Sequence, residues 1–457
     1  MAIALAAFLQ LLLVPLFSLA AAVFLLLHAR ARAQPTCTLV FHRPGGEQGV
    51  ITANPANLEH VMRAGFGNYP KGPRFASALH DFLGHGILNV DGHAWRAQRK
   101  AASYKFNTRS LRLFVARTVH DELHGRLLPL LRRAAGSGRQ IDLQDTLERY
   151  AFDNICRVAF DHDPQQLPDG DAAEGTATTT ESSRFAGAFR DAANHIPLRR
   201  PGALEGKEGA QPGLRAPAPR VHRRGARLRR PHHPGEGYTE TALLDVVISF
   251  LLAGRETTSS ALTWFFWLLS SRPDVERRIR DEVAAVRARR AISDVRRAGF
   301  DLDELREMHY VHAAITESMR LYPPVPVNSV QARAADVLPD GTAVRAGWFV
   351  SYNSYAMGRM ESVWGEHARA YRPERWLDPA EGTFRPESPF RYIVFHAGPR
   401  ICLGKEMAYI QMKSIVACVV EEFEVAVDGG YTPRPVASLT LRMADGLPVR
   451  VKAPSRT

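Results

Sequence analysis

Apolar side chains recur at helical spacing through much of this 457-residue chain. Residues three and four apart lie on one face of an α-helix, so apolar positions repeated at that interval indicate a helix with one buried side. The pattern predicts helices over residues 54–63, 94–105, 110–135, 143–160, 239–269, 274–290, 303–321 and 404–423.

Short runs of β-branched and aromatic residues predict a minor β component. Residues 38–42 and 49–52 flank Arg43-Pro44-Gly45-Gly46, which predicts a hairpin. Residues 337–355 contain short strands around the turn Pro339-Asp340-Gly341, and the chain is expected to end in a hairpin around Ala444-Asp445-Gly446. The expected fold class is therefore mainly α with minor β.

The N-terminus predicts a membrane anchor. Residues 2–27 contain no charged side chain, and about 20 apolar residues span a bilayer. His28, Arg30 and Arg32 follow at once, which places that end in the cytosol. A cleaved signal peptide is the alternative, but the run is longer than such peptides use and lacks a basic start. We expect a transmembrane anchor over residues 1–28 and one domain over residues 36–453.

One segment breaks the pattern. The chain carries a formal net charge of +12, and residues 199–234 hold ten Lys or Arg against two Glu. A nucleic-acid partner would therefore rest on this segment alone. Arg, Pro, Gly, Ala and His dominate it, so it cannot bury enough apolar surface to offset the entropy of ordering. Residues 198–237 are expected to be disordered, or translated from a GC-rich exon in a shifted frame.

Four cysteines, Cys37, Cys156, Cys402 and Cys418, have neither zinc spacing nor the density of a disulfide framework. A reducing compartment fits them. Three are expected to be small buried apolar residues. Cys402 differs, because it lies directly ahead of a predicted helix, where the helix N-terminus and the nearby Arg400 favour a thiolate.

Residues 395–404, FHAGPRICLG, surround this cysteine. Gly398 and Gly404 would let the backbone approach a flat cofactor, and Phe395 can shield the sulfur. A thiolate on haem iron donates electron density that helps to split the O–O bond. At every fixed position the segment resembles the haem loop of the cytochromes P450, F-x-x-G-x-R-x-C-x-G. The alternative is a structural loop with a buried cysteine.

The resemblance implies the cytochrome P450 fold, haem b as cofactor and Cys402 as the iron ligand. It extends to residues 253–258, AGRETT, where Gly, an acid and a hydroxyl interrupt an apolar helix. In that family Glu256 would relay protons and Thr257 would orient the water that protonates bound dioxygen. A solvated acid beside a capping hydroxyl is the alternative.

Two further motifs resemble the family. Glu317 and Arg320 share a helix face, and Arg375 would complete a structural triad in a segment where Trp376 replaces the family's Phe; a surface ion pair is the alternative. Trp95 and Arg99 match the family's W-x-x-x-R helix and would donate to a haem propionate, although packing alone can explain such a pair.

Segments including FHRPGG (41–46) and YAMGRM (355–360) resemble the plant fatty-acid ω-hydroxylase branch, which includes hydroxylases of the jasmonoyl-isoleucine hormone. The resemblance implies a substrate pocket lined by Phe82, Leu83, Ile87, Leu88, Val325 and Val327, where core packing is the alternative for each residue. Two features depart from the family: the chain after the anchor is short, and the helices that roof the pocket are not recognisable at residues 199–234.

The expected function is terminal hydroxylation of a fatty acid or a fatty-acid-derived hormone conjugate, using O₂ at haem iron on the endoplasmic reticulum membrane. No nucleotide-binding fingerprint lies in the chain, so electrons from NADPH would come through a separate flavin reductase. Basic surface near the haem would meet the acidic surface of that reductase. The alternatives are a haem-thiolate isomerase or dehydratase without external electrons, which often lacks the acid–threonine pair, and an inactive product of a mispredicted gene.

Overall fold

The computed structural model describes residues 36–42, 48–106, 108–167, 181–195, 239–290 and 298–454. The expected anchor (1–28) and the anomalous segment (198–237) lie outside these ranges. Within them, no helix has both the length and the apolarity needed to cross a membrane. The chain divides into two units, Met1–Gly72 with Val327–Arg369 and Ser388–Ile401, and Pro73–Pro326 with Ala370–Glu387 and Cys402–Thr457.

The first unit is built on a four-stranded sheet with the order β1-β2-β7-β4. Strands β1 (Thr38–His42) and β2 (Gln48–Thr52) are antiparallel, which confirms the predicted hairpin. Strand β7 (Phe349–Asn353) runs parallel to β2, and β4 (Val327–Gln331) runs antiparallel to β7. The turn at residues 339–341 joins β5 (Asp336–Val337) to β6 (Ala343–Val344), as expected.

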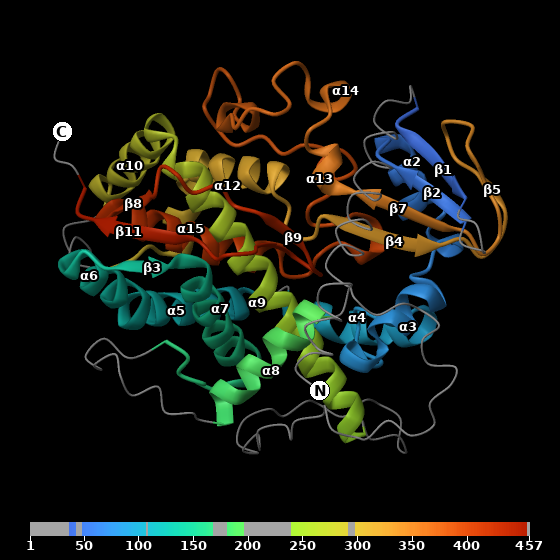
Figure 1. Ribbon diagram of the computed structural model, residues 1–457, viewed down its shortest axis with the longest axis horizontal. Helices are drawn as coiled ribbons and strands as arrows, with labels where there is room; N and C mark the ends of the chain where they lie inside the picture. The colour runs from blue at the N-terminus through green and yellow to red at the C-terminus, as the bar shows by residue number, and fades with distance from the viewer. Residues whose placement is uncertain are drawn as a thin grey trace, which may run out of the picture. The chain divides into compact units, whose positions relative to one another are not determined.

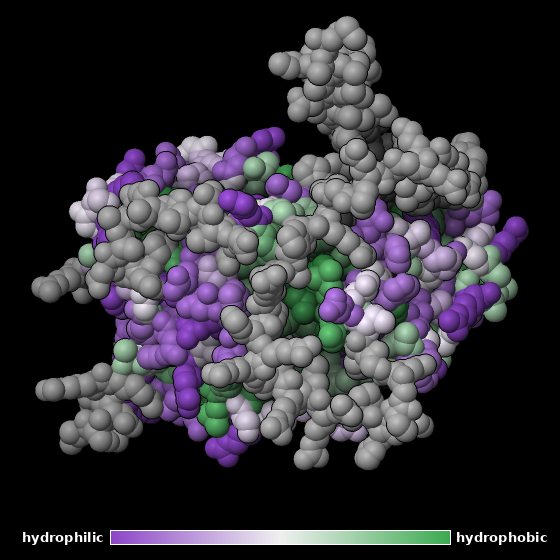
Figure 2. Space-filling model, turned by 90° about the horizontal axis from the view of Figure 1, so that it is seen from below, coloured by the Kyte–Doolittle hydropathy of each residue, from purple (hydrophilic) through white to green (hydrophobic). Residues whose placement is uncertain are grey.

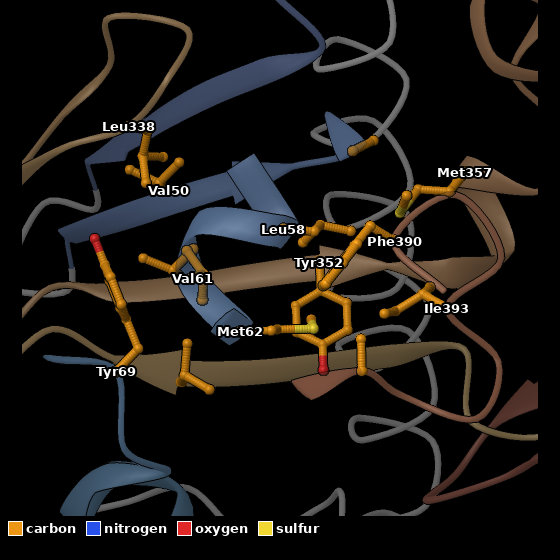
Figure 3. Close-up of a cluster of buried hydrophobic side chains, with 14 of the residues drawn as sticks. Val50, Leu58, Val61, Met62, Tyr69, Leu338, Tyr352, Met357, Phe390 and Ile393 are labelled. Atoms are coloured by element: carbon orange, nitrogen blue, oxygen red, sulfur yellow. The ribbon is translucent and has the colours of Figure 1, made fainter. Parts of the chain in front are cut away.

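A short helix covers this sheet and closes the core of the first unit. Helix α2 (Pro55–Glu59) starts where Asn54 accepts a hydrogen bond from the Ala56 backbone N–H, and the π-helical turn His60–Ala64 continues it. Its residues Leu58, Val61 and Met62 pack among side chains of the sheet and of the loop at residues 390–397 (Figure 3). The core therefore joins three stretches that are far apart in the sequence.

The second unit is mainly helical (Figure 1). Its helices are α3 (Gly72–Leu83), α4 (Gly92–Phe106), α5 (Arg109–Glu122), α6 (Leu128–Ser137), α7 (Leu143–Phe160), α8 (Glu181–His195), α9 (Glu240–Ser270), α10 (Pro273–Ala288), α11 (Leu302–Glu307), α12 (His309–Leu321) and α15 (Lys405–Glu422). The helix predicted over residues 143–160 has the observed bounds, and the mainly α fold with minor β is confirmed.

The central pair is α7 and α9, which pack closely together. Gly254 explains why: a Cβ atom at this position would lie 2.5 Å from Cγ1 of Ile155. In the sequence, Gly254 is one of the residues that interrupt an apolar helix at the motif of residues 253–258. The structure gives it a packing reason, since only glycine allows α7 to approach α9 at this point.

Two predicted elements are wrong in detail. The helix expected over residues 303–321 is two helices, because Asp301 and Glu304 form a capping box on α11 and Glu282 accepts the Tyr310 and Val311 backbone N–H groups that begin α12. The expected C-terminal hairpin is also absent from the described residues. Strand β10 (Leu441–Met443) pairs with β9 (Pro435–Ala437), whereas β11 (Pro448–Lys452) pairs with β3 (Gln140–Asp142) and β8 (Glu424–Val427).

Candidate functional site

Cys402 lies in the second unit, three residues before the start of α15. It is exposed, whereas Cys156 and Cys418 are buried as expected and Cys37 is only partly buried. The protein atoms around the sulfur raise the pKa of the Cys402 thiol, while the Gly404 N–H and the charges of Arg99 and Lys405 act in the opposite direction. The site thus offers a reachable sulfur with cationic and N–H groups that favour its thiolate form.

Helix α4 brings a cation toward this sulfur. Burial lowers the pKa of the Arg99 guanidinium, and the charge of Cys402 acts against that shift. Arg99 and Cys402 therefore lie within electrostatic reach of each other, although they are about 300 residues apart in the sequence. Trp95, one helical turn before Arg99, is buried. Arg99 thus contributes a positive charge near the sulfur, and the roles of Trp95 and Arg99 toward a haem propionate stay predictions.

The rest of the motif, including Phe395, Gly398 and Arg400, belongs to the first unit. Gly398 has a φ of +64°, and a Cβ atom there would lie 2.0 Å from the Met62 carbonyl oxygen. Glycine is therefore required at this position for backbone packing, a reason that differs from the expected approach to a cofactor. Arg400 lowers the pKa of the buried Tyr352 phenol, which burial raises more strongly.

Glu256 and Thr257 lie in the middle of α9. Glu256 is buried, so the alternative of a solvated acid is wrong. Its Oε1 accepts a hydrogen bond from Nη1 of Arg255 at 2.5 Å. The Thr257 hydroxyl, which is partly exposed, donates to the carbonyl of Ala253 at 2.8 Å. The two side chains are thus held differently, one by a buried cation and one by the backbone of its own helix.

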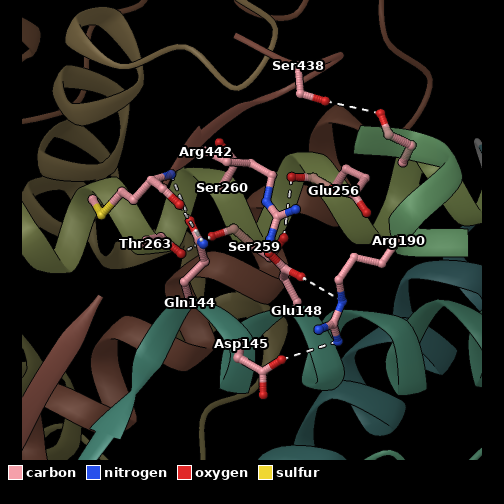
Figure 4. A network of polar contacts seen from close by, with 12 residues as sticks. Gln144, Asp145, Glu148, Arg190, Glu256, Ser259, Ser260, Thr263, Ser438 and Arg442 are labelled. Atoms are coloured by element: carbon pink, nitrogen blue, oxygen red, sulfur yellow. Dashed lines mark hydrogen bonds and ion pairs between the residues drawn. The ribbon is translucent and has the colours of Figure 1, made fainter. Parts of the chain in front are cut away.

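A buried ionic network continues from Glu256 to α7 (Figure 4). Arg255 also donates to Glu148, which in turn accepts a hydrogen bond from Arg442 of β10. This network was not predicted from the sequence. An arginine inside an apolar helix does indicate a buried partner, but nothing local indicates Glu148, which is 107 residues away.

The predicted triad is assembled in the second unit. Glu317 and Arg320 are both buried and form two hydrogen bonds of 2.7 Å, so the alternative of a surface ion pair is wrong. Nε of Arg375 lies 3.4 Å from Oε1 of Glu317. Trp376 donates its indole N–H to Oε2 of Glu317 at 2.9 Å. A phenylalanine could not donate this bond, so the departure from the family pattern adds a further hydrogen bond to the carboxylate.

Three of the expected pocket residues belong to one apolar cluster of the second unit. Leu83 is buried, and Phe82 and Leu88 pack against the same group, which includes Phe189 of α8 and Leu251 of α9. Ile87 and Val325 are partly buried, as is Val327 of the first unit. Leu83 is 1% exposed and is explained by core packing. Figure 2 shows hydrophobic side chains gathered at the centre of a face whose other described residues are largely hydrophilic.

Known proteins resemble this chain over most of its length. The family model described as Cytochrome P450 matches residues 27–201 and 226–445, so the match is interrupted within the anomalous segment. Cytochrome P450 CYP94D108 of Paris polyphylla is 48% identical, over 93% of this chain and 87% of that protein. Cytochrome P450 94A1 of Vicia sativa is 39% identical, over 92% and 84%. Cytochrome P450 94B3 of Arabidopsis thaliana is 40% identical, over 92% and 86%.

Proposed function

The chain belongs to the cytochrome P450 family, and from this premise we propose that it hydroxylates the terminal or a near-terminal carbon of a fatty acid or fatty-acid-derived hormone conjugate. As a member of that family it is a monooxygenase that uses haem iron, O₂ and electrons from a reductase, and acts on an apolar substrate. The identity of the substrate and the carbon attacked are the proposal.

The donor set of the second unit fits haem. Cys402 is the exposed cysteine, with Arg99 within electrostatic reach of its sulfur. Cys402 would hold the iron as a thiolate, and Trp95 and Arg99 would donate to a propionate. Gly404 of the same unit would flank this group, and resemblance to the family motif alone assigns Phe395, Gly398 and Arg400 to haem. When bound, the haem supplies the O₂ chemistry, and the triad of Glu317, Arg320 and Arg375 supports the scaffold beside it.

Glu256 and Thr257 would supply the protons. Glu256 is buried and ionically held, which suits a group that exchanges a proton inside the protein. Thr257 is partly exposed, and its oxygen keeps acceptor capacity while its proton is donated to Ala253. That oxygen can therefore orient a water molecule. The presence of both residues favours oxygen activation over the isomerase and dehydratase alternative.

The observation that carries the substrate proposal is the likeness of named segments to the plant fatty-acid ω-hydroxylase branch. It is supported by the partly buried apolar side chains of Phe82 and Leu88, which pack against one cluster. Ile87 and Val325 of the same unit would extend this lining. An acyl chain requires such an apolar surface, because burying it removes apolar area from water.

A substrate panel tests the proposal. The protein, supplied with reductase and NADPH, should convert free fatty acids or an amino-acid conjugate of a fatty-acid-derived hormone into products with a hydroxyl at or next to the terminal carbon, identified by mass spectrometry. Turnover restricted to compact ring systems would refute the proposed substrate class. The carbon monoxide difference spectrum of the reduced protein should show the red-shifted Soret band of a thiolate ligand, which an inactive gene product would lack.

The cellular setting is also a proposal. We place the protein on the endoplasmic reticulum membrane through residues 1–28, with the catalytic domain in the cytosol beside an NADPH-dependent reductase. The uncharged run at residues 2–27 and the basic residues after it support this placement. Membrane fractionation of the full chain and of a chain lacking residues 1–28 tests it, since only the full chain should sediment with the membranes.

A further inference from the structure

Three arginines from three elements converge on the carboxylate of Glu148 in α7. Nη2 of Arg255 in α9 lies 3.1 Å from Oε2. Nη2 of Arg442 in β10 lies 2.5 Å from Oε1, and Nε of Arg190 in α8 lies 3.6 Å from Oε2. Glu148 is 2% exposed. A carboxylate removed from water to this degree needs paired cations, and here it has several.

Arg255 connects this carboxylate to the proposed proton relay. Its Nη2 donates to Glu148 while its Nη1 donates to Glu256, so two carboxylates share one guanidinium. The rings of Phe189 and Phe152 lie under the guanidinium at 5.7 and 5.9 Å and shield it from water. In such surroundings, a change of charge at Glu148 is felt by Glu256 through both Arg255 and direct repulsion.

The two carboxylates already influence each other. Burial raises the pKa of Glu148, and the negative charge of Glu256 raises it further, while Arg442, Arg255 and Arg190 act in the opposite direction. By reciprocity, the charge of Glu148 repels a charge on Glu256. The positive charge of Arg255 is also divided between the two carboxylates, since Nη1 donates to Glu256 and Nη2 donates to Glu148. Both effects weaken the net electrostatic stabilisation of the Glu256 carboxylate.

We propose that Glu148 is a positioning residue for Glu256: by engaging one half of Arg255, it keeps the Glu256 carboxylate loosely enough held to take up a proton from solvent and pass it on. After each transfer Glu256 returns to its starting state, so no other reactant is needed. The inference rests on the proposed role of Glu256.

Glu148→Gln tests the inference, because the amide has nearly the same shape and no charge. In this variant Arg255 holds Glu256 more tightly, so Glu256 takes up a proton less readily. Product formed per NADPH should fall about tenfold, and its pH profile should move to lower pH by about one unit. A purely structural role would lower activity without moving the pH profile.

Asp145→Asn is the matched control. Asp145 lies one helical turn before Glu148 and pairs with Arg190 and Arg149, but the network does not connect it directly to Arg255. Its pH profile should match that of the wild type. Both variants should retain the thiolate-type carbon monoxide spectrum and the substrate-induced spectral shift, which shows that haem and substrate are bound.

Glu256→Gln separates this inference from the proposed function. If Glu256→Gln leaves product per NADPH unchanged, the relay role of Glu256 is wrong. If it lowers that ratio and the profile of Glu148→Gln still matches the wild type, only the inference fails. Should Glu148→Gln not fold, Arg255→Met gives the opposite test. Its profile should move to higher pH, since Glu256 then lacks its cation, and an unmoved profile overturns the proposal.

Discussion

At the scale of single residues, the proposed ligand can be tested by substitution. Cys402→Ala should abolish the red-shifted Soret band of the reduced carbon monoxide complex and abolish turnover, because no other group offers a thiolate at that position. Cys156→Ala and Cys418→Ala are controls, since both sulfurs are buried in the core. Cys37→Ala should likewise leave the spectrum unchanged. A wild-type spectrum from Cys402→Ala would exclude this residue as the ligand.

Thr257→Ala should separate binding from proton delivery. The hydroxyl donates to the Ala253 carbonyl, a local bond that α9 can lose without unfolding. Haem and substrate binding should therefore persist, while electrons are lost as peroxide. A general-acid contribution of this kind is worth about 10²–10⁴-fold in the proton-transfer step. Thr257→Ser retains the hydroxyl and should keep most of the product per NADPH, whereas an undiminished yield from Thr257→Ala would disprove the role.

The spacing of residues along a helix predicts some contacts of the site but not others. Glu317 and Arg320 meet because residues three apart share a helix face, and the sequence alone indicates this. The indole N–H of Trp376 was not predicted, since the family pattern has phenylalanine at this position. Glu148 was missed for a different reason: a buried arginine requires some partner, but the fold alone decides which distant carboxylate comes within reach.

At the scale of elements, periodicity predicted most of the long helices, and turn signals predicted two of the three expected strand pairs. Helix α7 has the predicted bounds, and residues 110–135 form one helical stretch from α5 to α6 with a π-helical turn between them. The break between α11 and α12 depends on Glu282, which is distant in sequence. The turn at residues 444–446 is real, since Gly446 has a φ of +69°. Its flanking strands pair elsewhere because tertiary contacts override local turn signals.

The η6 turn (Pro373–Trp376) is expected to stabilise α12 through Trp376. Trp376→Phe removes an N–H bond to the buried Glu317 carboxylate and should lower the free energy of unfolding by about 1–3 kcal/mol. Trp364→Phe is the matched control: Trp364 is also buried, but it donates to the neutral carbonyl of Met357. Chemical denaturation should show the larger loss for Trp376→Phe. Equal losses would mean that the charge of Glu317 adds nothing to this contact.

At the scale of the whole molecule, the sequence predicted the fold class, because helical periodicity is a short-range pattern. The assignment of the motif residues to haem stays a prediction. The ten-residue motif around Cys402 crosses the boundary between the two units. Glycine is required at position 398 of this motif because the backbone packs against Met62 in the first unit. Such reasons could not be predicted, because they arise from contacts between segments that are hundreds of residues apart.

A buried carboxyl makes the stability of the whole protein depend on pH. Asp153 of α7 is 0% exposed and accepts the backbone N–H groups of Gln166 and Leu167, which holds the loop after α7. Burial raises the pKa of Asp153 from 3.8 to about 7, with a further contribution from the negative charge of Glu122, while the two N–H groups oppose the shift. The folded protein therefore retains a proton here that the unfolded chain has already released.

The sign of the effect follows from this difference. Between about pH 4 and about pH 7 the native state binds one more proton at Asp153 than the unfolded state, so the free energy of unfolding falls as pH rises, by at most about 1.4 kcal/mol per pH unit. Asp153→Asn removes this dependence, so the variant should gain stability relative to the wild type from pH 5 to pH 7 in urea denaturation. Asp163→Asn is the control. Burial is the largest single influence and raises the pKa of Asp163, but the hydrogen bond and charge of Arg126, the Gln165 N–H and the charge of Arg157 together outweigh it and lower that pKa. The Asp163 carboxylate stays ionised from pH 5 to pH 7, so the free energy of unfolding of Asp163→Asn should change with pH as that of the wild type does. Parallel curves for Asp153→Asn as well would show that the Asp153 carboxyl does not keep its proton in the fold.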